Sequence, residues 1–269
     1  PLLTTKSGEI VNAVYGFTSI LLKVLKDIKP QYIAVAWDLR GKTFRHEMYK
    51  EYKATREKKP QELYDQIIRI KEVLNAFNIA SFEKPGFEAD DLIGALCVKE
   101  HVNNPSVDCV IVTGDLDTLQ LIDDNTYVYS LKKGISDMVI YDAKAVQDRY
   151  GLRPDQLIDY KALRGDPSDN IPGVPGIGEK TASEILQAFG TLEKVYEALD
   201  KAKSGGSGAG KQADKIKDRI KKSLLDNRDA AFLSKKLVTI IRDAKIIDNG
   251  SRGKDGDKFD LEKTRVSKV

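Results

Sequence analysis

Residues 107–117, Val-Asp-Cys-Val-Ile-Val-Thr-Gly-Asp-Leu-Asp, decide the fold class of this chain. The first seven are mostly apolar and rich in β-branched side chains, which is typical of a buried parallel strand. Gly114 ends the run, and Asp115 and Asp117 stand two residues apart at the start of a short helix expected over residues 116–122. In open α/β sheets, functional sites lie beyond the carboxyl ends of the strands. The stretch therefore predicts an α/β sheet with two carboxylates at its functional edge.

The segments around this stretch alternate between strand and helix. A second apolar run, residues 31–37, predicts another buried strand, which ends at Asp38. Further strands are expected over residues 79–82, 126–130 and 138–141, and helices over 10–28, 62–75 and 88–100. This alternation predicts an α/β fold with a twisted, mostly parallel sheet flanked by helices.

From residue 142 onward the apolar spacing becomes helical. Asp142 is a suitable helix cap and Gly151 a suitable helix stop. More helices are expected near residues 154–164, 179–189, 192–199, 213–225 and 228–235. We therefore predict two domains, an α/β metal-binding domain over residues 1–141 and a helical region over residues 142–269.

Acidic residues in four tight groups stand out along the chain. They are Asp38; Glu88, Asp90 and Asp91; Asp115 and Asp117; and Asp166 and Asp169. Two bare charges at ~4 Å repel by about 4 kcal/mol at an effective dielectric constant near 20, so a shared pocket needs a cation to fill it. Oxygen ligands suit Mg²⁺ or Mn²⁺, and such ions catalyse phosphoryl transfer. The sequence thus predicts a carboxylate-lined metal site.

Three of these groups also have a simpler explanation. Asp115 could simply be a helix cap, although capping does not account for Asp117. The acids of residues 88–91 suit the first turn of a helix, and for this segment alone the helix dipole is a sufficient reason. The stretch 165–173 is rich in turn-forming residues, so it could be an ordinary polar turn. Only convergence of the four groups favours metal binding over these explanations.

A basic segment, residues 40–59, contains the candidate nucleic-acid contacts Arg45, Tyr52, Lys53 and Arg56. Basic side chains interleaved with aromatic ones suit single-stranded nucleic acid, because the aromatic rings stack on nucleobases and the basic groups pair with phosphates. The alternative is a solvated basic helix face. The net charge of the whole chain, +3, says little about partners.

The glycine-rich turn at residues 173–178 leads into a helix. Gly176, Gly178 and Lys180 could bind a DNA phosphate through free N–H groups and a positive helix end, without contacting a base. The alternative is a plain helix–helix turn. A second glycine-rich stretch, residues 204–210, is expected to be a flexible linker. It matches the start of a P-loop, but Gln212 stands where Ser or Thr must hold magnesium.

Composition excludes several classes of protein. No apolar run approaches the roughly 20 residues of a membrane span, so we expect no membrane contact. The first residues lack the pattern of a signal peptide. Cys97 and Cys109 are expected to be buried reduced thiols, which fits a cytoplasmic protein. The two histidines are too few for a multi-histidine zinc site.

Taken together, the chain resembles the 5′-nuclease family, and closely the 5′→3′ exonuclease domains of bacterial DNA polymerases I. The resemblance is carried by residues 12–17, 44–47, 52–54, 86–91, 150–154 and 165–178. It implies a helical arch over the active site and a helix-hairpin-helix region that grips duplex DNA. It also implies cleavage of 5′ ends and 5′ flaps in primer removal and repair, a bacterial cytoplasmic location, and a polymerase domain after this one.

The resemblance assigns roles by position. The eight acids match metal-binding positions for two or more Mg²⁺ or Mn²⁺ ions. Lys53 and Arg56 match basic residues that contact the scissile phosphate. Gly176 and Gly178 match the DNA-backbone hairpin, which in the family often holds a monovalent cation. The expected partner is DNA with a 5′ flap, a nick or a single-strand–duplex junction.

In the family, a strand that ends in an Asp precedes the Thr4-Thr5-Lys6 segment, and we expect it to be missing from this chain. Two alternatives therefore stay open. One is a catalytically impaired fragment that binds DNA junctions, and the other is a metal-dependent ribonuclease.

Overall fold

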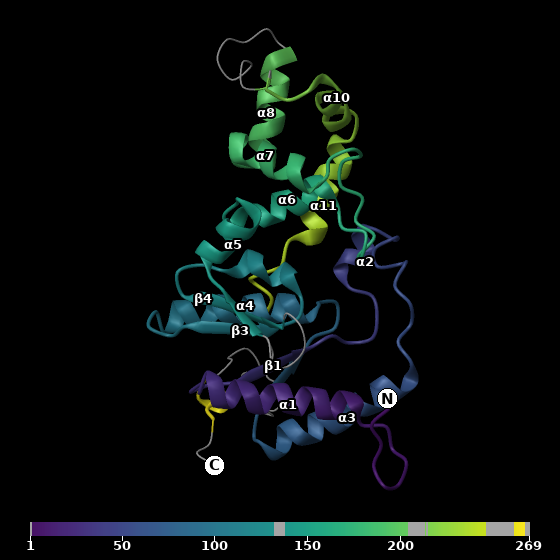
Figure 1. The fold of residues 1–269 in the computed structure, drawn as a ribbon, viewed down its shortest axis with the longest axis vertical. Helices are drawn as coiled ribbons and strands as arrows, with labels where there is room; N and C mark the ends of the chain where they lie inside the picture. Colours follow the sequence, from purple (N-terminus) through teal and green to yellow (C-terminus); the bar gives the residue numbers. More distant parts are fainter. Residues whose placement is uncertain (1, 132–137, 204–212, 214, 246–260, 267–269) are drawn as a thin grey trace.

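Short strands and the helices packed on them form one end of the molecule, and a group of helices forms the other (Figure 1). The computed structural model describes residues 2–131, 138–203, 213, 215–245 and 261–266. The linker expected at 204–210 lies outside these residues. Within the described part of the chain, no helix is both long and apolar enough to span a bilayer.

The α/β end follows the strand and helix order expected from the sequence. Its elements are α1 (Asn12–Asp27), β1 (Ala34–Trp37), α2 (Phe44–Met48), α3 (Gln61–Ala76), β2 (Ala80–Glu83), α4 (Ala89–Asn103), β3 (Cys109–Thr113), the 3₁₀ helix η1 (Leu116–Leu121), β4 (Thr126–Leu131) and β5 (Met138–Tyr141). Between α2 and α3, where the resemblance implies a helical arch, residues 50–55 form turns. Pro60 stands at the N-cap position of α3 with a φ of −63°.

The strands form two small sheets. β1 pairs with β2 in parallel, with Ala34 opposite Ala80. β3 pairs with β4 in parallel, and β4 with β5 antiparallel. The α/β class and the parallel pairing are confirmed, but the single sheet expected from the sequence is divided. Among the described residues no ladder joins β1 to β3.

Helix α4 lies between the two sheets and packs on both. Leu92 and Ala95 contact Phe82 of β2, whereas Cys97 belongs to the cluster around Ile111 of β3. Burying a leucine such as Leu92 stabilises the fold by roughly 1.5–3 kcal/mol. This packing fixes the first turn of α4, which carries an acidic group, relative to the ends of β1 and β3.

The expectation of reduced thiols is wrong in this structure, because Cys97 and Cys109 are joined as a disulfide. The packing of α4 on β3 brings their Cα atoms to 5.9 Å, within the range that a disulfide spans. The sequence showed two cysteines in apolar segments but not that the segments touch.

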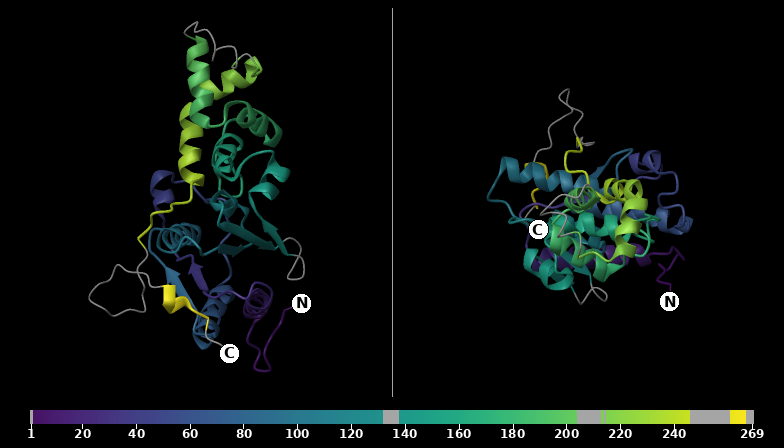
Figure 2. Two further views of the ribbon diagram at one scale, coloured as in Figure 1. Left: turned by 90° about the vertical axis from the view of Figure 1, so that its left-hand side faces the viewer. Right: turned by 90° about the horizontal axis from the view of Figure 1, so that it is seen from above.

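The helical end comprises α5 (Ala143–Tyr150), η2 (Pro154–Gln156), α6 (Leu157–Arg164), α7 (Glu179–Phe189), α8 (Leu192–Lys203), α10 (Asp218–Asp226) and α11 (Arg228–Val238); the 3₁₀ helix η3 (Leu261–Thr264) lies near the C-terminus. The Asp142 carboxylate caps α5 as expected, accepting from Ala145 N at 2.7 Å, and Gly151 ends it with a φ of 67°. The chain leaves α11 and runs back along the α/β end (Figure 2).

Candidate functional site

Three of the predicted acids, at the ends of β1 and β3 and the start of α4, lie near enough to interact electrostatically. Asp38 follows β1, and its Oδ1 accepts from the N–H of Ala89 in the first turn of α4 at 2.8 Å. Asp115 follows β3 and caps η1, accepting from the N–H of Asp117 at 2.9 Å. Asp90 lies in the first turn of α4. Among the described residues, none of these three acids, Asp38, Asp90 and Asp115, forms an ion pair.

The electrostatics of Asp90 reflect this crowding. Burial, followed by the carboxylates of Asp115 and Asp38, raises the pKa of Asp90 to about 7, with smaller effects from Asp117 and Glu88. An uncompensated carboxylate among others gains protons for this reason. We call Asp38, Asp90 and Asp115 the unpaired acids.

The next two acids share a lysine. The ammonium of Lys161 on α6 contacts Asp117 and lies 2.7 Å from Asp166. Burial tends to raise the pKa of Asp166, but hydrogen bonds from Lys161 and Ser168 prevail and lower it to about 2. Burial raises the pKa of Asp117, with Lys161 opposing the shift. Lys161 escaped the sequence analysis, because nothing local distinguishes it from other helical lysines.

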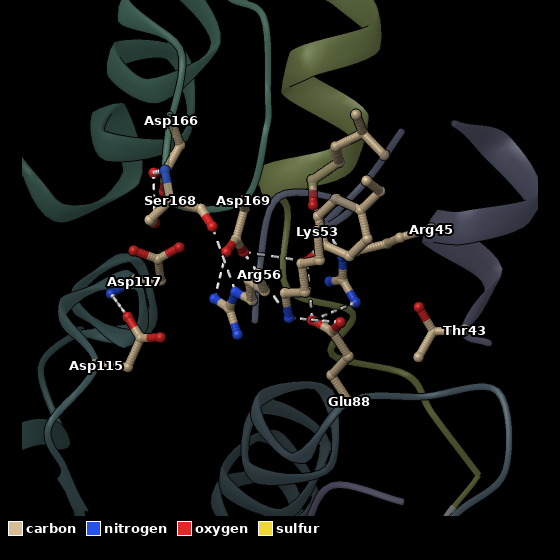
Figure 3. A network of polar contacts seen from close by, with 12 residues as sticks. Thr43, Arg45, Lys53, Arg56, Glu88, Asp115, Asp117, Asp166, Ser168 and Asp169 are labelled. Carbon is tan, nitrogen blue, oxygen red and sulfur yellow. Dashed lines mark hydrogen bonds and ion pairs between the residues drawn. The ribbon is translucent and has the colours of Figure 1, made fainter. Parts of the chain in front are cut away.

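Glu88 and Asp169 are joined by the predicted basic residues. Lys53 Nζ lies 2.7 Å from Glu88 and 3.8 Å from Asp169, and Arg56 pairs with Asp169. The Tyr52 hydroxyl donates toward both carboxylates, at 3.1 and 3.3 Å, and the side chain is 3% exposed, so it cannot stack on DNA as expected. Figure 3 shows Lys53 and Arg56 between the acids of the two ends of the molecule. Segments 52–56, 88–91 and 166–169 therefore converge in the structure.

Two predicted site residues lie elsewhere. Arg45 and Asp91, expected to contact DNA and metal respectively, form a bidentate pair at 2.7 and 2.8 Å. They are 3% and 0% exposed, and Arg45 also lies 3.5 Å from Glu88, so the pair lies buried behind that acid.

The glycine turn before α7 is anchored by its apolar residues and exposes its backbone. Val174 and Ile177 are buried in the helical core. Gly176, with a φ of 81°, and Gly178, the N-cap of α7, are exposed. Lys180 is exposed too, and its ammonium lies 3.9 Å from Glu184. The geometry leaves backbone N–H groups at the start of α7 open to an anion.

The donor set of the unpaired acids suits a hard divalent cation, since it consists of carboxylate oxygens without a compensating positive charge. As the side chains stand, no three His, Cys, Asp or Glu residues of the described chain are close enough together to hold an ion. The residues fit a metal by their chemistry and their electrostatic coupling, and binding requires the carboxylates to draw closer.

The sequence of this chain matches models of one protein family. The model for the 5′-3′ exonuclease N-terminal resolvase-like domain matches residues 1–151, and the model for the 5′-3′ exonuclease C-terminal SAM fold matches residues 152–251. The chain belongs to the 5′-3′ exonuclease family. The two models meet about ten residues after the boundary predicted from the sequence at 141/142.

The related sequences are DNA polymerases I. That of Caldicellulosiruptor bescii is 44% identical over 245 residues, which is 90% of this chain and 27% of that protein. That of Bacillus subtilis is 43% identical over 246 residues, 91% of this chain and 26% of that protein. The chain therefore spans about a quarter of the length of these relatives.

Solved structures share the fold at lower identity. The T5 5′-exonuclease with bound zinc superposes with a TM-score of 0.64 at 24% identity, covering 84% of this chain and 81% of that one. The catalytic core of Rad2 in complex with DNA substrate gives a TM-score of 0.52 at 20% identity, covering 88% and 73%. These likenesses establish the fold.

Proposed function

We propose that this chain is a Mg²⁺-dependent nuclease that cleaves DNA at 5′ ends and at 5′ flaps. The observation that carries the proposal is the position of Asp90, which is buried and lies near enough to Asp115 and Asp38 for burial and their charges to raise its pKa to about 7. Membership of the 5′-3′ exonuclease family supports it. So does a solved structure of similar fold, the T5 flap endonuclease with DNA and metal ions.

The three unpaired acids would hold the ion. A divalent ion in such a site activates water for attack on a phosphodiester and stabilises the leaving oxygen. Two or more ions remain a proposal, and Asp117 and Asp166 are the candidates for a second site. Glu88 and Asp169 hold Lys53 and Arg56 beside the pocket. These two bases would neutralise the phosphate that is cut.

The exposed turn at residues 175–178 would bind the duplex part of the substrate. Its N–H groups and Lys180 can meet phosphates but carry no side chain that distinguishes bases, so cleavage would depend on junction shape rather than on sequence. The same proposal includes a monovalent cation at this turn and a division of the chain at residues 141/142. It also includes a polymerase domain in the parent protein and a bacterial cytoplasmic location.

Cleavage of a 5′-flap duplex in Mg²⁺ tests the proposal, with Asp115→Asn as the main variant. The variant is expected to lose cleavage while keeping affinity for the flap DNA in Ca²⁺. Asp148→Asn, an exposed acid paired with Lys144, is the control and should cut normally. Cleavage by Asp115→Asn at the wild-type rate would contradict the proposal, and preferential cutting of single-stranded RNA would favour a ribonuclease.

A further inference from the structure

Residues 237–241, where the chain leaves α11, are held by buried side chains of the α/β end. Arg45 donates from Nε to the carbonyl of Leu237 and from Nη2 to the carbonyl of Thr239, each at 2.8 Å. The N–H of Ile241 donates to Asp91 Oδ1 at 2.9 Å. The Arg45–Asp91 pair therefore binds the backbone of three alternate residues.

A glutamine binds the residues between them. Gln120 of η1 donates from Nε2 to the carbonyl of Val238 at 3.0 Å, and its Oε1 accepts from the N–H of Ile240 at 3.0 Å. Leu237 and Val238 end α11, so their carbonyls have no donor within the helix. Arg45 and Asp91 thus satisfy backbone groups of residues 237, 239 and 241, and Gln120 satisfies those of residues 238 and 240. We call these three side chains the clamp.

The hydrogen bonds of Asp91 are complete without a metal. Its Oδ1 accepts from Arg45 and Ile241, and its Oδ2 accepts from Arg45 and from the N–H of Glu88 at 3.0 Å. An ionised carboxylate offers about four acceptor positions, and all are used here. An ion could bind Asp91 only by displacing a buried donor, which costs about 1–3 kcal/mol or more. Likewise, an arginine that is 3% exposed cannot reach a phosphate.

The clamp joins the parts of the molecule that the proposed function needs in fixed relation. Asp91 follows Asp90 in α4, and Gln120 lies in the same short helix, η1, as Asp117. The held segment continues from α11, whose Ser234 accepts from the N–H of Gly173 at the glycine turn. These hydrogen bonds, together with the last turn of α11, therefore connect the acidic pocket to the proposed duplex-binding turn.

We propose that Arg45, Asp91 and Gln120 are positioning residues, which hold the acidic pocket at a fixed distance from the duplex-binding turn through residues 237–241. The proposal rests on the proposed function, because it presupposes that one DNA molecule contacts both places. It replaces the roles that the sequence suggested, a metal ligand for Asp91 and a DNA contact for Arg45.

A DNA with a long duplex arm reaches both the pocket and the turn, whereas one with a very short arm reaches the pocket alone. A rigid connection makes the second contact effectively intramolecular, so the long arm binds more tightly. Loosening the clamp should weaken the long-arm complex and leave the short-arm complex unchanged. A residue that merely stabilises the fold would leave this ratio of affinities unaltered in the folded protein.

The test measures, by fluorescence anisotropy in Ca²⁺, the affinity of the full chain for 5′-flap DNA with a long or a short duplex arm. Calorimetry measures its affinity for Mn²⁺. The variants are Asp91→Asn and Gln120→Leu. The control is Asp155→Asn, which breaks another bidentate pair, with Arg153, but one that is exposed. In the clamp variants the preference for the long arm should fall about tenfold, which corresponds to 1.4 kcal/mol. The control should keep it.

Mn²⁺ affinity separates the two roles of Asp91. The proposal expects the Mn²⁺ dissociation constant of Asp91→Asn to stay within about threefold of wild type, since a change of that size is below 1 kcal/mol. A loss of Mn²⁺ binding, or a preserved long-arm preference in both clamp variants, would overturn it. If Asp91→Asn does not fold, Arg45→Lys decides in the same way, because it keeps the charge but not the bidentate geometry. A wild-type chain without any long-arm preference would refute the proposed duplex-binding turn as well.

Discussion

Replacing Asp90 by asparagine is expected to stabilise the metal-free protein while abolishing its response to Mg²⁺. The reason is the environment of Asp90, which is buried beside Asp38 and Asp115 and has a pKa of about 7 instead of its ordinary value of 3.8. Ionised Asp90 therefore costs folding free energy when no cation is bound. Asparagine has nearly the same shape without the charge.

The magnitude follows from the pKa. A shift of about three units corresponds to about 4 kcal/mol at pH 8, where Asp90 is ionised in both the folded and the unfolded state. Because the folded state binds this proton more tightly, the contribution is most favourable below the unfolded pKa and is lost as pH rises through 7. The metal-free wild type should thus lose about 2–3 kcal/mol between pH 5 and pH 8 that the asparagine variant keeps.

Urea unfolding in EDTA at pH 5 and pH 8 measures this difference, with Asp155→Asn as an exposed control. Added Mg²⁺ should then stabilise the wild type, by about 2.7 kcal/mol at 100 times its dissociation constant, and should leave Asp90→Asn unchanged. An Asp90→Asn variant that is less stable than wild type at pH 8 in EDTA would refute the reasoning. So would equal stabilisation of both proteins by Mg²⁺.

Three further predictions concern the surroundings of the pocket. Lys161→Met leaves Asp117 and Asp166 without the lysine ammonium that pairs with both. It should therefore lower the free energy of unfolding in EDTA by about 3–5 kcal/mol, measured by urea unfolding, and added Mn²⁺ should restore part of this loss. Lys53→Ala should lower kcat on flap DNA by about 10²–10³-fold in single-turnover assays, with the Mn²⁺ dissociation constant unchanged. Gly173→Ala, where φ is 61° and an added Cβ would lie 2.3 Å from Gly165 N, should lower Tm in calorimetry, whereas Gly178→Ala, with open space around it, should not.

Local signals in the sequence predicted much of the fold. The apolar run ending at Thr113, the cap at Asp142 and the stop at Gly151 depend on neighbouring residues alone, so their elements were expected within a few residues of the observed bounds. The division of the sheet was not expected, because strand pairing is a long-range property. The Cys97–Cys109 disulfide was missed for the same reason.

The candidate site was predictable where residues follow the carboxyl ends of strands. Asp38 and Asp115 lie where the topology of α/β sheets puts them. The sequence could not show that Asp90 faces the pocket whereas Asp91 pairs with Arg45. Adjacent positions on a helix point about 100° apart, and only the packing of α4 decides which one faces the pocket. The partners of Asp91, Arg45 and Ile241, are 46 and 150 residues away.

The central claim is that distant carboxylates gather into one pocket whose charge a divalent cation balances. The most direct measurement is the anomalous scattering of Mn²⁺ soaked into crystals of this chain. We predict one strong peak bound by the carboxylates of Asp38, Asp90 and Asp115, at about the 2.0–2.2 Å expected for a small divalent ion and oxygen. Crystals that bind Mn²⁺ only at other surfaces, with these three side chains apart, would contradict the claim.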